Sequence, residues 1–196
     1  MFVERNPLSM RMISVLISVF LAVSASTAQY SGGTGDPNDP YQIATAVDLI
    51  ALGERPQDYG KHFVLTADID LDPNLPGGKV FDKAVIGAAE SPTASEGSNR
   101  ATPFTGVFDG RGHVIWNLTI VGGGYLGLFA ELGAEAQVRN LGLEAVEING
   151  TGCFVGCLAG VNDGTIAMSY VGGSVRADEC VGGLVGLHHG RIVAGY

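Results

Sequence analysis

The chain has 196 residues, with 20 acidic against 11 basic side chains and a formal net charge of −9. No cluster of Lys or Arg is available to neutralise phosphates, which argues against nucleic acid as a partner. The length predicts one domain with a long continuous core.

The N-terminus has the layout of a secretory signal peptide over residues 1–28. Arg5 and Arg11 precede an apolar stretch at 12–23, and small residues follow it. We predict cleavage after Ala25 or Ala28, so that the protein is secreted or held at the cell surface. A membrane anchor is the alternative, but an apolar stretch of about 12 residues is shorter than the roughly 20 that span a bilayer as a helix. Removal of residues 1–28 leaves 19 acidic and 9 basic side chains.

Residues 29–60 form a lead segment that ends in a short helix. Its first part is rich in Gly, Asp and Pro, which indicates turns. Thr45 is a suitable N-cap, Asp48 stands three residues later in the capping-box position, and Gly53 ends the helical pattern. We expect this helix to cap the open end of the fold that follows at 61–196, with a free-standing surface helix as the alternative.

Residues 62–72 alternate in polarity as a strand does. Ile69 and Leu71 fall on the face that we expect in the core, and three carboxylates, Asp68, Asp70 and Asp72, fall on the other. The carboxylate spacing makes these three weak calcium candidates, although Pro73 and Lys79 break the pattern of an EF-hand loop. A solvated acidic row, or aspartates that cap turns, is the favoured interpretation.

The stretch 88–102 is small and polar, and it predicts a projecting loop, either disordered or functional. Strands resume at 104–120 around a tight turn that begins at Asp109, where we expect a turn former rather than an acid catalyst. Trp116 is expected to pack in the core, with a sugar-stacking platform on a sheet face as the alternative.

An internal repeat dominates the C-terminal half. The segment 155–170 returns at 181–196, a period of about 26 residues, which is in the range typical of solenoids. Each unit has short apolar runs between glycines, including Val155, Leu158, Val161, Ile166 and Tyr170. Helical repeats need longer uninterrupted helices, and each interior Gly would cost about 1 kcal/mol, whereas short strands with corners supplied by glycine suit the composition. The sequence therefore predicts an all-β solenoid.

Weaker copies of the unit precede the clear pair. The motif at 127–130 matches that at 157–160, and Asn117 can be laid on Asn140, which gives spacings of about 23, 28 and 26 residues. Asn117, Asn140 and Asn162 recur near corners and could stack as a hydrogen-bonded ladder.

These repeats resemble the bacterial GLUG-motif proteins, named for a Gly-Leu-any-Gly core. Gly183, Leu184 and Gly186 fit the core fully, Leu158 and Gly160 follow a Cys in the first position, and Gly127 and Leu128 precede an Ala in the last. The resemblance covers roughly residues 30–196. It implies a right-handed parallel β-solenoid (β-helix) in exported, surface or adhesin-like proteins, sometimes attached to enzymatic domains, with no catalytic residue in the repeats.

Three cysteines lie in the repeat zone. If the period of the clear pair holds, Cys180 lies over Phe154, so Cys153 is its near neighbour and a Cys153–Cys180 disulfide is one prediction. The simpler interpretation is that the cysteines pack as small apolar residues, because no His or Cys pair completes a zinc site.

The preferred function is an exported, non-enzymatic β-solenoid module that acts as a surface scaffold, adhesion or binding domain for a glycan or protein. The alternative is a carbohydrate-active β-helix, of polysaccharide lyase or glycosidase type, for which Asp68, Asp70 and Asp109 are the available carboxylates. No cofactor is expected beyond calcium. The repeat reaches residue 196, which predicts end-to-end self-association or continuation in a longer chain.

Overall fold

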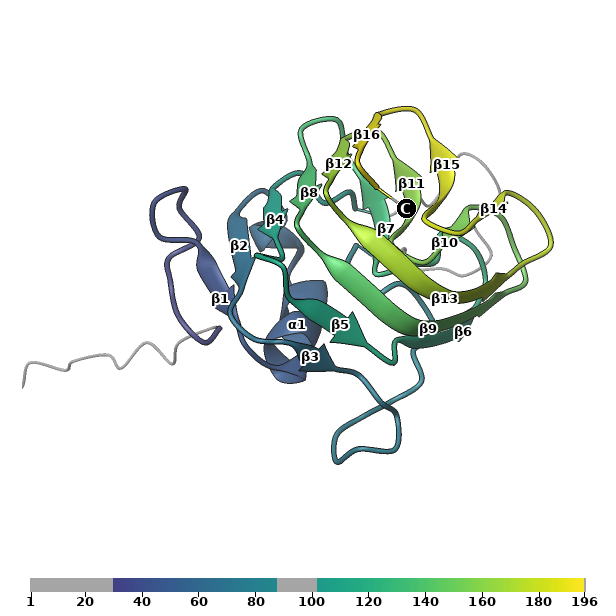
Figure 1. Cartoon of the computed structure of the whole chain (residues 1–196), viewed down its shortest axis with the longest axis horizontal. Coiled ribbons are helices and arrows are strands. Elements are labelled where there is room, and N and C mark those ends of the chain that lie inside the picture. The colour runs from purple at the N-terminus through teal and green to yellow at the C-terminus, as the bar shows by residue number, and fades with distance from the viewer. Residues whose placement is uncertain (1–29, 88–101, 196) are drawn as a thin grey trace, which may run out of the picture.

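The computed structural model describes residues 30–87 and 102–195. The predicted signal peptide and nearly all of the loop at 88–102 lie outside these residues. The described chain winds into stacked coils of short strands (Figure 1), and every pair of named strands in it is parallel. The fold is the predicted β-solenoid.

Each face of the solenoid is a parallel sheet to which successive coils contribute one strand. The first face has the order β1 (Tyr41–Ile43), β2 (His62–Leu65), β4 (Val107–Asp109), β8 (Gln137–Arg139), β12 (Thr165–Ala167) and β16 (Arg191–Val193). The second has the order β13 (Tyr170–Arg176), β9 (Gly142–Gly150), β5 (Val114–Trp116) and β3 (Ile69–Asp70), with β6 (Thr119–Gly122) also on β9. The third joins β15 (Val185–His188), β11 (Ala159–Asn162) and β7 (Phe129–Leu132), and a short ladder joins β10 (Val155–Gly156) to β14 (Val181–Gly182).

The strand register confirms the two later spacings. Val155 pairs with Val181 and Ile166 with Ile192, as the period of the clear pair predicts. Val138 pairs with Ile166, as the longer spacing before it predicts. The motif at 127–130 also lies beside that at 157–160, because Phe129 pairs with Ala159.

The expected spacing of 23 is wrong. Phe108 pairs with Val138 and Ile115 with Leu143, so the earlier coil is at least as long as the one that follows it, and not shorter. Asn117 and Asn140 both adopt left-handed backbone angles, φ 58° and 52°, but they occupy different corners. The turns at Asn117 and Asn140 have similar local conformations, and this similarity led to the wrong alignment of the two coils.

The expected asparagine ladder is wrong for the same reason. Asn117 donates from Nδ2 to Asp70 Oδ1 over 2.8 Å, and Asn140 donates from Nδ2 to Asp109 Oδ1 over 3.0 Å. Each amide therefore contacts a carboxylate rather than another asparagine.

Non-glycine residues supply the left-handed corners. Tyr125, Phe154 and Cys180 stack at one corner with φ of 56°, 62° and 49°, and Asn140, Met168 and Ala194 follow β8, β12 and β16 with φ of 52°, 47° and 50°. Glycine was expected where the chain needs positive φ or close backbone approach. In the repeats its main role is close approach: a Cβ at Gly160 would lie 2.7 Å from the Phe154 carbonyl oxygen and 2.8 Å from that of Ala130.

The N-terminal end is covered by the predicted capping helix. Helix α1 (Ala46–Gly53) has the predicted capping box between Thr45 and Asp48, and it is followed by the 3₁₀ helix η1 (Pro56–Asp58). Leu49 and Leu52 are fully buried in the same core cluster as the strands. Strand β1, from the lead segment, pairs with β2 and forms the edge of the first face.

The C-terminal end is open within the described chain. Strands β13 to β16 each pair on one side only, and Leu184, Val185 and Ile192 are half-buried while their counterparts one coil earlier are buried. No helix in residues 30–87 and 102–195 is both long and apolar enough to cross a membrane.

Candidate functional site

The repeat motif forms part of the core rather than a reactive site. Leu128 and Leu158 are buried, and the Leu158 amide donates to the Leu184 carbonyl over 3.0 Å, so the motif leucines lie over one another. The last motif glycine is sterically required: a Cβ at Gly186 would clash with the Val155 backbone nitrogen. The first motif position differs between coils: a Cβ at Gly183 would meet nothing within 4 Å, whereas one at Gly127 would lie 2.6 Å from the Gly156 carbonyl oxygen.

The three aspartates of the acidic face each accept hydrogen bonds. Asp68 Oδ1 accepts from the Val114 amide and lies 3.0 Å from His113 Nδ1, and these bonds lower the pKa of the Asp68 carboxyl. Asp70 accepts from the Asp72 amide, and Asp72 accepts from the amide of Asn74. The Asp70 and Asp72 bonds are local turn contacts, whereas Asp68 contacts a neighbouring coil.

A calcium site at Asp68, Asp70 and Asp72 stays a prediction. Within the described ranges no three His, Cys, Asp or Glu side chains are grouped so as to hold a metal ion. A rise in melting temperature in millimolar calcium relative to EDTA would support such a site, and no shift would reject it.

The three cysteines are not bridged in the structure, and their surroundings differ. Cys153 Sγ donates to Glu179 Oε2 over 3.3 Å, and this bond is the main reason that the pKa of the Cys153 thiol is raised. Cys180 is exposed and contacts the Cys153 thiol, so the Cys153–Cys180 disulfide stays a prediction. Cys157 is buried, and its burial raises the pKa of the thiol to about 11.

An open cleft of about 540 Å³ lies on the outer surface where the first face turns into the second. Asp109 from β4, Asn140 after β8, and Met168 and Tyr170 around the β12–β13 corner line it. Three successive coils therefore contribute one wall segment each.

Asp109 is the fixed polar centre of this cleft. Its carboxylate accepts from the Arg111 amide over 2.9 Å, from Asn140 Nδ2 over 3.0 Å, and from Arg139 Nε over 2.9 Å. Partial burial alone would raise the pKa of Asp109, but the hydrogen bonds from Asn140, Arg111 and Arg139 outweigh it and lower the pKa. Asp109 is thus an ionised acceptor.

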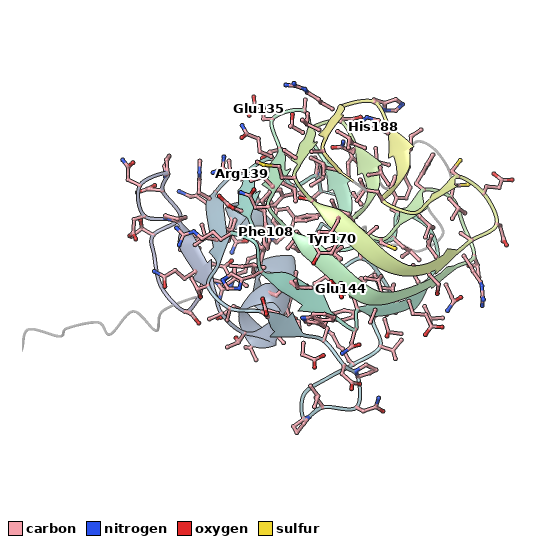
Figure 2. All side chains as sticks on the ribbon, viewed as in Figure 1. Phe108, Glu135, Arg139, Glu144, Tyr170 and His188 are labelled. Carbon is pink, nitrogen blue, oxygen red and sulfur yellow. The ribbon has the colours of Figure 1, made fainter. Side chains whose placement is uncertain are left out.

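Tyr170 forms an aromatic wall that is held in one orientation. Its ring lies over Gly142, where a Cβ would come within 2.7 Å of Tyr170 Cζ, so only glycine leaves room for the ring. Its hydroxyl donates to Glu144 Oε1 over 2.9 Å. Figure 2 shows Tyr170 and Glu144 next to each other on the second face, with Arg139 near the corner.

Sequence reasoning weighed only Asp109 of this cleft as a site residue. Tyr170 was counted among the apolar repeat positions, whereas its side chain lies on the outer face. Trp116 was expected in the core, but it is 36% exposed on β5. The available signal was the alternation around 141–144, where Leu141 and Leu143 are buried and Gly142 and Glu144 therefore face outward.

Two curated proteins are similar to this chain. Halomucin from Haloquadratum walsbyi is 34% identical over 169 residues, which is 83% of this chain and 2% of halomucin. A putative Gly-rich membrane protein from Evansella cellulosilytica is 34% identical over 164 residues, which is 79% of this chain and 17% of that protein.

The chain therefore spans a small part of each relative. No family model and no solved structure matches it. The likeness to GLUG-motif proteins stays a prediction.

Proposed function

We propose that this chain is an exported β-solenoid module that acts outside the cytoplasm as a scaffold and binding surface, without catalysis. Three observations support the proposal: the layout of residues 1–28, the acidic composition, and the similarity to a halomucin and to a Gly-rich membrane protein. The stacked sheets supply the long flat faces that such a role needs.

One observation carries the proposal. Polar side chains on the outer surface are tied from coil to coil: Asp70 to Asn117, Asp109 to Asn140, Asp163 to His189, and Glu144 to Tyr170. Each bond joins strands or corners that are neighbours along the axis. The outer surface is therefore a fixed array of polar groups, which suits recognition of a partner.

Asp68 and Asp109, two of the carboxylates of the enzymatic alternative, are poorly suited to acid catalysis. A glycosidase needs one carboxylic acid with a raised pKa facing a second carboxylate. The pKa values of Asp68 and Asp109 are lowered by the hydrogen bonds that they accept. The two also have different partners, since Asp68 contacts His113 on the second face and Asp109 contacts Arg139 on the first.

Export is tested by expression of the full chain with its own leader in a bacterial host. We expect the protein outside the cytoplasm with an intact mass that corresponds to cleavage after Ala25 or Ala28, and a variant lacking residues 12–23 should stay inside. Extracellular protein that retains Met1 would reject cleavage, and retention of both forms in the cytoplasm would reject export.

Catalysis is tested on neutral and acidic polysaccharides by the release of new reducing or unsaturated ends. We expect no turnover by the unchanged protein. Products that disappear in Asp68→Asn, Asp70→Asn or Asp109→Asn would establish the enzymatic alternative.

We propose further that the open C-terminal end contacts a second copy of the chain. The half-buried Leu184 and Ile192 and the one-sided strands β13 to β16 support this contact, because uncovered strand edges favour edge-to-edge association. Light scattering should show dimers or longer assemblies at high concentration. A monodisperse monomer would reject the contact. The open edge would then be covered by a further coil of polypeptide instead of a second copy.

A further inference from the structure

We propose that the cleft at Asp109, Asn140 and Tyr170 binds a pyranose unit of a linear polysaccharide that lies along the solenoid axis. This inference rests on the proposed role as a binding surface and names its ligand class. The cleft volume, about 540 Å³, is within the range of roughly 300 to 1,000 Å³ for small-ligand sites.

The aromatic wall provides the apolar half of the recognition. The hydroxyl end of the Tyr170 ring lies over Gly142, and the residue lines the cleft. The face of an aromatic ring carries partial negative charge, and it attracts the polarised C–H groups on the flat side of a sugar ring. The bond to Glu144 fixes the ring before a ligand arrives, which reduces the entropy lost on binding.

The polar wall provides the directional half. An ionised carboxylate offers about four acceptor positions, and Asp109 uses three of them on Arg111, Asn140 and Arg139. One position remains for a ligand hydroxyl, next to the planar Asn140 amide. The Asp109 carboxylate and the Asn140 amide lie side by side and match neighbouring hydroxyls of a sugar. The Tyr170 ring lines the same cleft and matches the sugar ring itself.

A second aromatic residue extends the site along the axis. Trp116 is 36% exposed and pairs in register with Glu144, so it faces outward beside that carboxylate. Tyr170 flanks the same Glu144 from the other side, through its hydroxyl. Strands β5 and β13 lie on either side of β9, so the Cα positions of Trp116 and Tyr170 are about 10 Å apart along the axis. They are also offset by two residues along the strands, because Tyr170 is in register with Gly142 and Trp116 with Glu144. Two aromatic residues on the strands that flank β9, both beside Glu144, indicate a ligand longer than a single sugar.

Affinity electrophoresis of the full chain in gels containing xylan, dextran or alginate tests the proposal. We expect retardation by at least one of these probes. Tyr170→Ala should weaken binding at least tenfold and Trp116→Ala several-fold. Tyr170→Phe keeps the ring and should stay within about threefold of the unchanged protein. Arg176→Ala, at the far end of β13, is the control on the same strand and should bind normally.

Each contrary outcome overturns the proposal. The first is that none of the three polysaccharides retards the unchanged protein. The second is that Arg176→Ala loses as much polysaccharide binding as Tyr170→Ala. The third is that Tyr170→Ala still binds the polysaccharide and only high salt abolishes this binding. A melting curve for every variant separates loss of binding from loss of folding. Export and absence of turnover are measured separately, so failure of the cleft leaves the scaffold function standing.

Discussion

The last two coils share the repeat pattern of Val, Gly, Leu, Ile and Tyr positions but have very different surroundings. Leu158 and Ile166 are buried in the penultimate coil, and their counterparts Leu184 and Ile192 are half-buried in the last one. Gly160 and Gly164 recur as Gly186 and Gly190, and β10, β11 and β12 pair in register with β14, β15 and β16. The difference arises only because one coil has a neighbour on both sides and the other has a neighbour on one.

This contrast shows where the stability of a solenoid comes from. A unit gains its burial from the units stacked on it, so identical residues contribute different free energies at different places. The first and last described coils show two outcomes: α1 covers the first coil with Leu49 and Leu52, whereas no described residue covers the last.

Thiol reactivity should show the largest difference between the two coils. Cys157 and Gly183 occupy the same motif position. Two single-thiol proteins, both lacking Cys153 and Cys180, would compare them: one keeps Cys157, and the other combines Cys157→Ala with Gly183→Cys. With the pKa of Cys157 raised to about 11, about one thiol in 1,000 is ionised at pH 8. We expect the Gly183→Cys protein to react with a maleimide about 100-fold faster or more.

The two maleimide reaction rates should also depend differently on pH. Since only the thiolate reacts, the rate at Cys157 should rise about tenfold per pH unit up to about pH 11, while the Gly183→Cys rate should level off near its ordinary pKa of about 8.5. Similar rates at the two positions would mean that the last coil is covered.

Truncation of the motif leucines should give the next largest effect. Leu158→Ala removes a side chain that is 1% exposed and leaves a cavity between two coils, so we expect a loss of about 3 kcal/mol in the free energy of unfolding. Leu184→Ala empties a site that solvent already reaches, and it should cost about 1 kcal/mol. Urea unfolding measures both, at a concentration where light scattering shows a monomer. Equal losses would contradict the open end.

Substitution of a motif glycine should also cost more stability in the penultimate coil than in the last one. A Cβ at Gly160 meets backbone oxygens of Phe154 and Ala130, so Gly160→Ala should cost about 2 kcal/mol through overpacking. Gly186→Ala should cost less, because the last coil can move toward solvent. Gly183→Ala is the matched control and should change stability by less than about 0.5 kcal/mol, since a Cβ there meets nothing within 4 Å. A large loss at Gly183 would contradict its open surroundings.

The solenoid and its cap could be predicted because their signals are local or periodic. The regular return of the motif fixed the stacking of β11 on β15, and Thr45 with Asp48 fixed the start of α1 within one turn. The coil containing β4 was misaligned because an Asn-Leu pair occurs at two different corners, at 117 and at 140. Short turn patterns identify a corner without saying which one.

The cleft could not be predicted because its members come from different coils. Asp109, Asn140 and Tyr170 belong to three successive coils, and they meet only through the register of β4, β8 and β12. That register depended on the coil length that was misjudged. The close contact between the Tyr170 ring and Gly142 likewise depends on the pairing of β13 with β9, which belong to neighbouring coils.

The smallest expected effect concerns the corner that follows β12 and β16. Met168 and Ala194 hold left-handed angles, φ 47° and 50°, which cost a non-glycine residue about 1 kcal/mol or more. Met168 is 59% exposed, so Met168→Gly loses little packing and should raise the free energy of unfolding by about 0.5–1 kcal/mol. Ala194→Gly relieves the same strain in the open coil, where fraying before global unfolding should hide most of the gain. If Ala194→Gly raised the free energy of unfolding more than Met168→Gly, the last coil would unfold together with the rest of the solenoid. The two coils would then differ in solvent exposure but not in local stability.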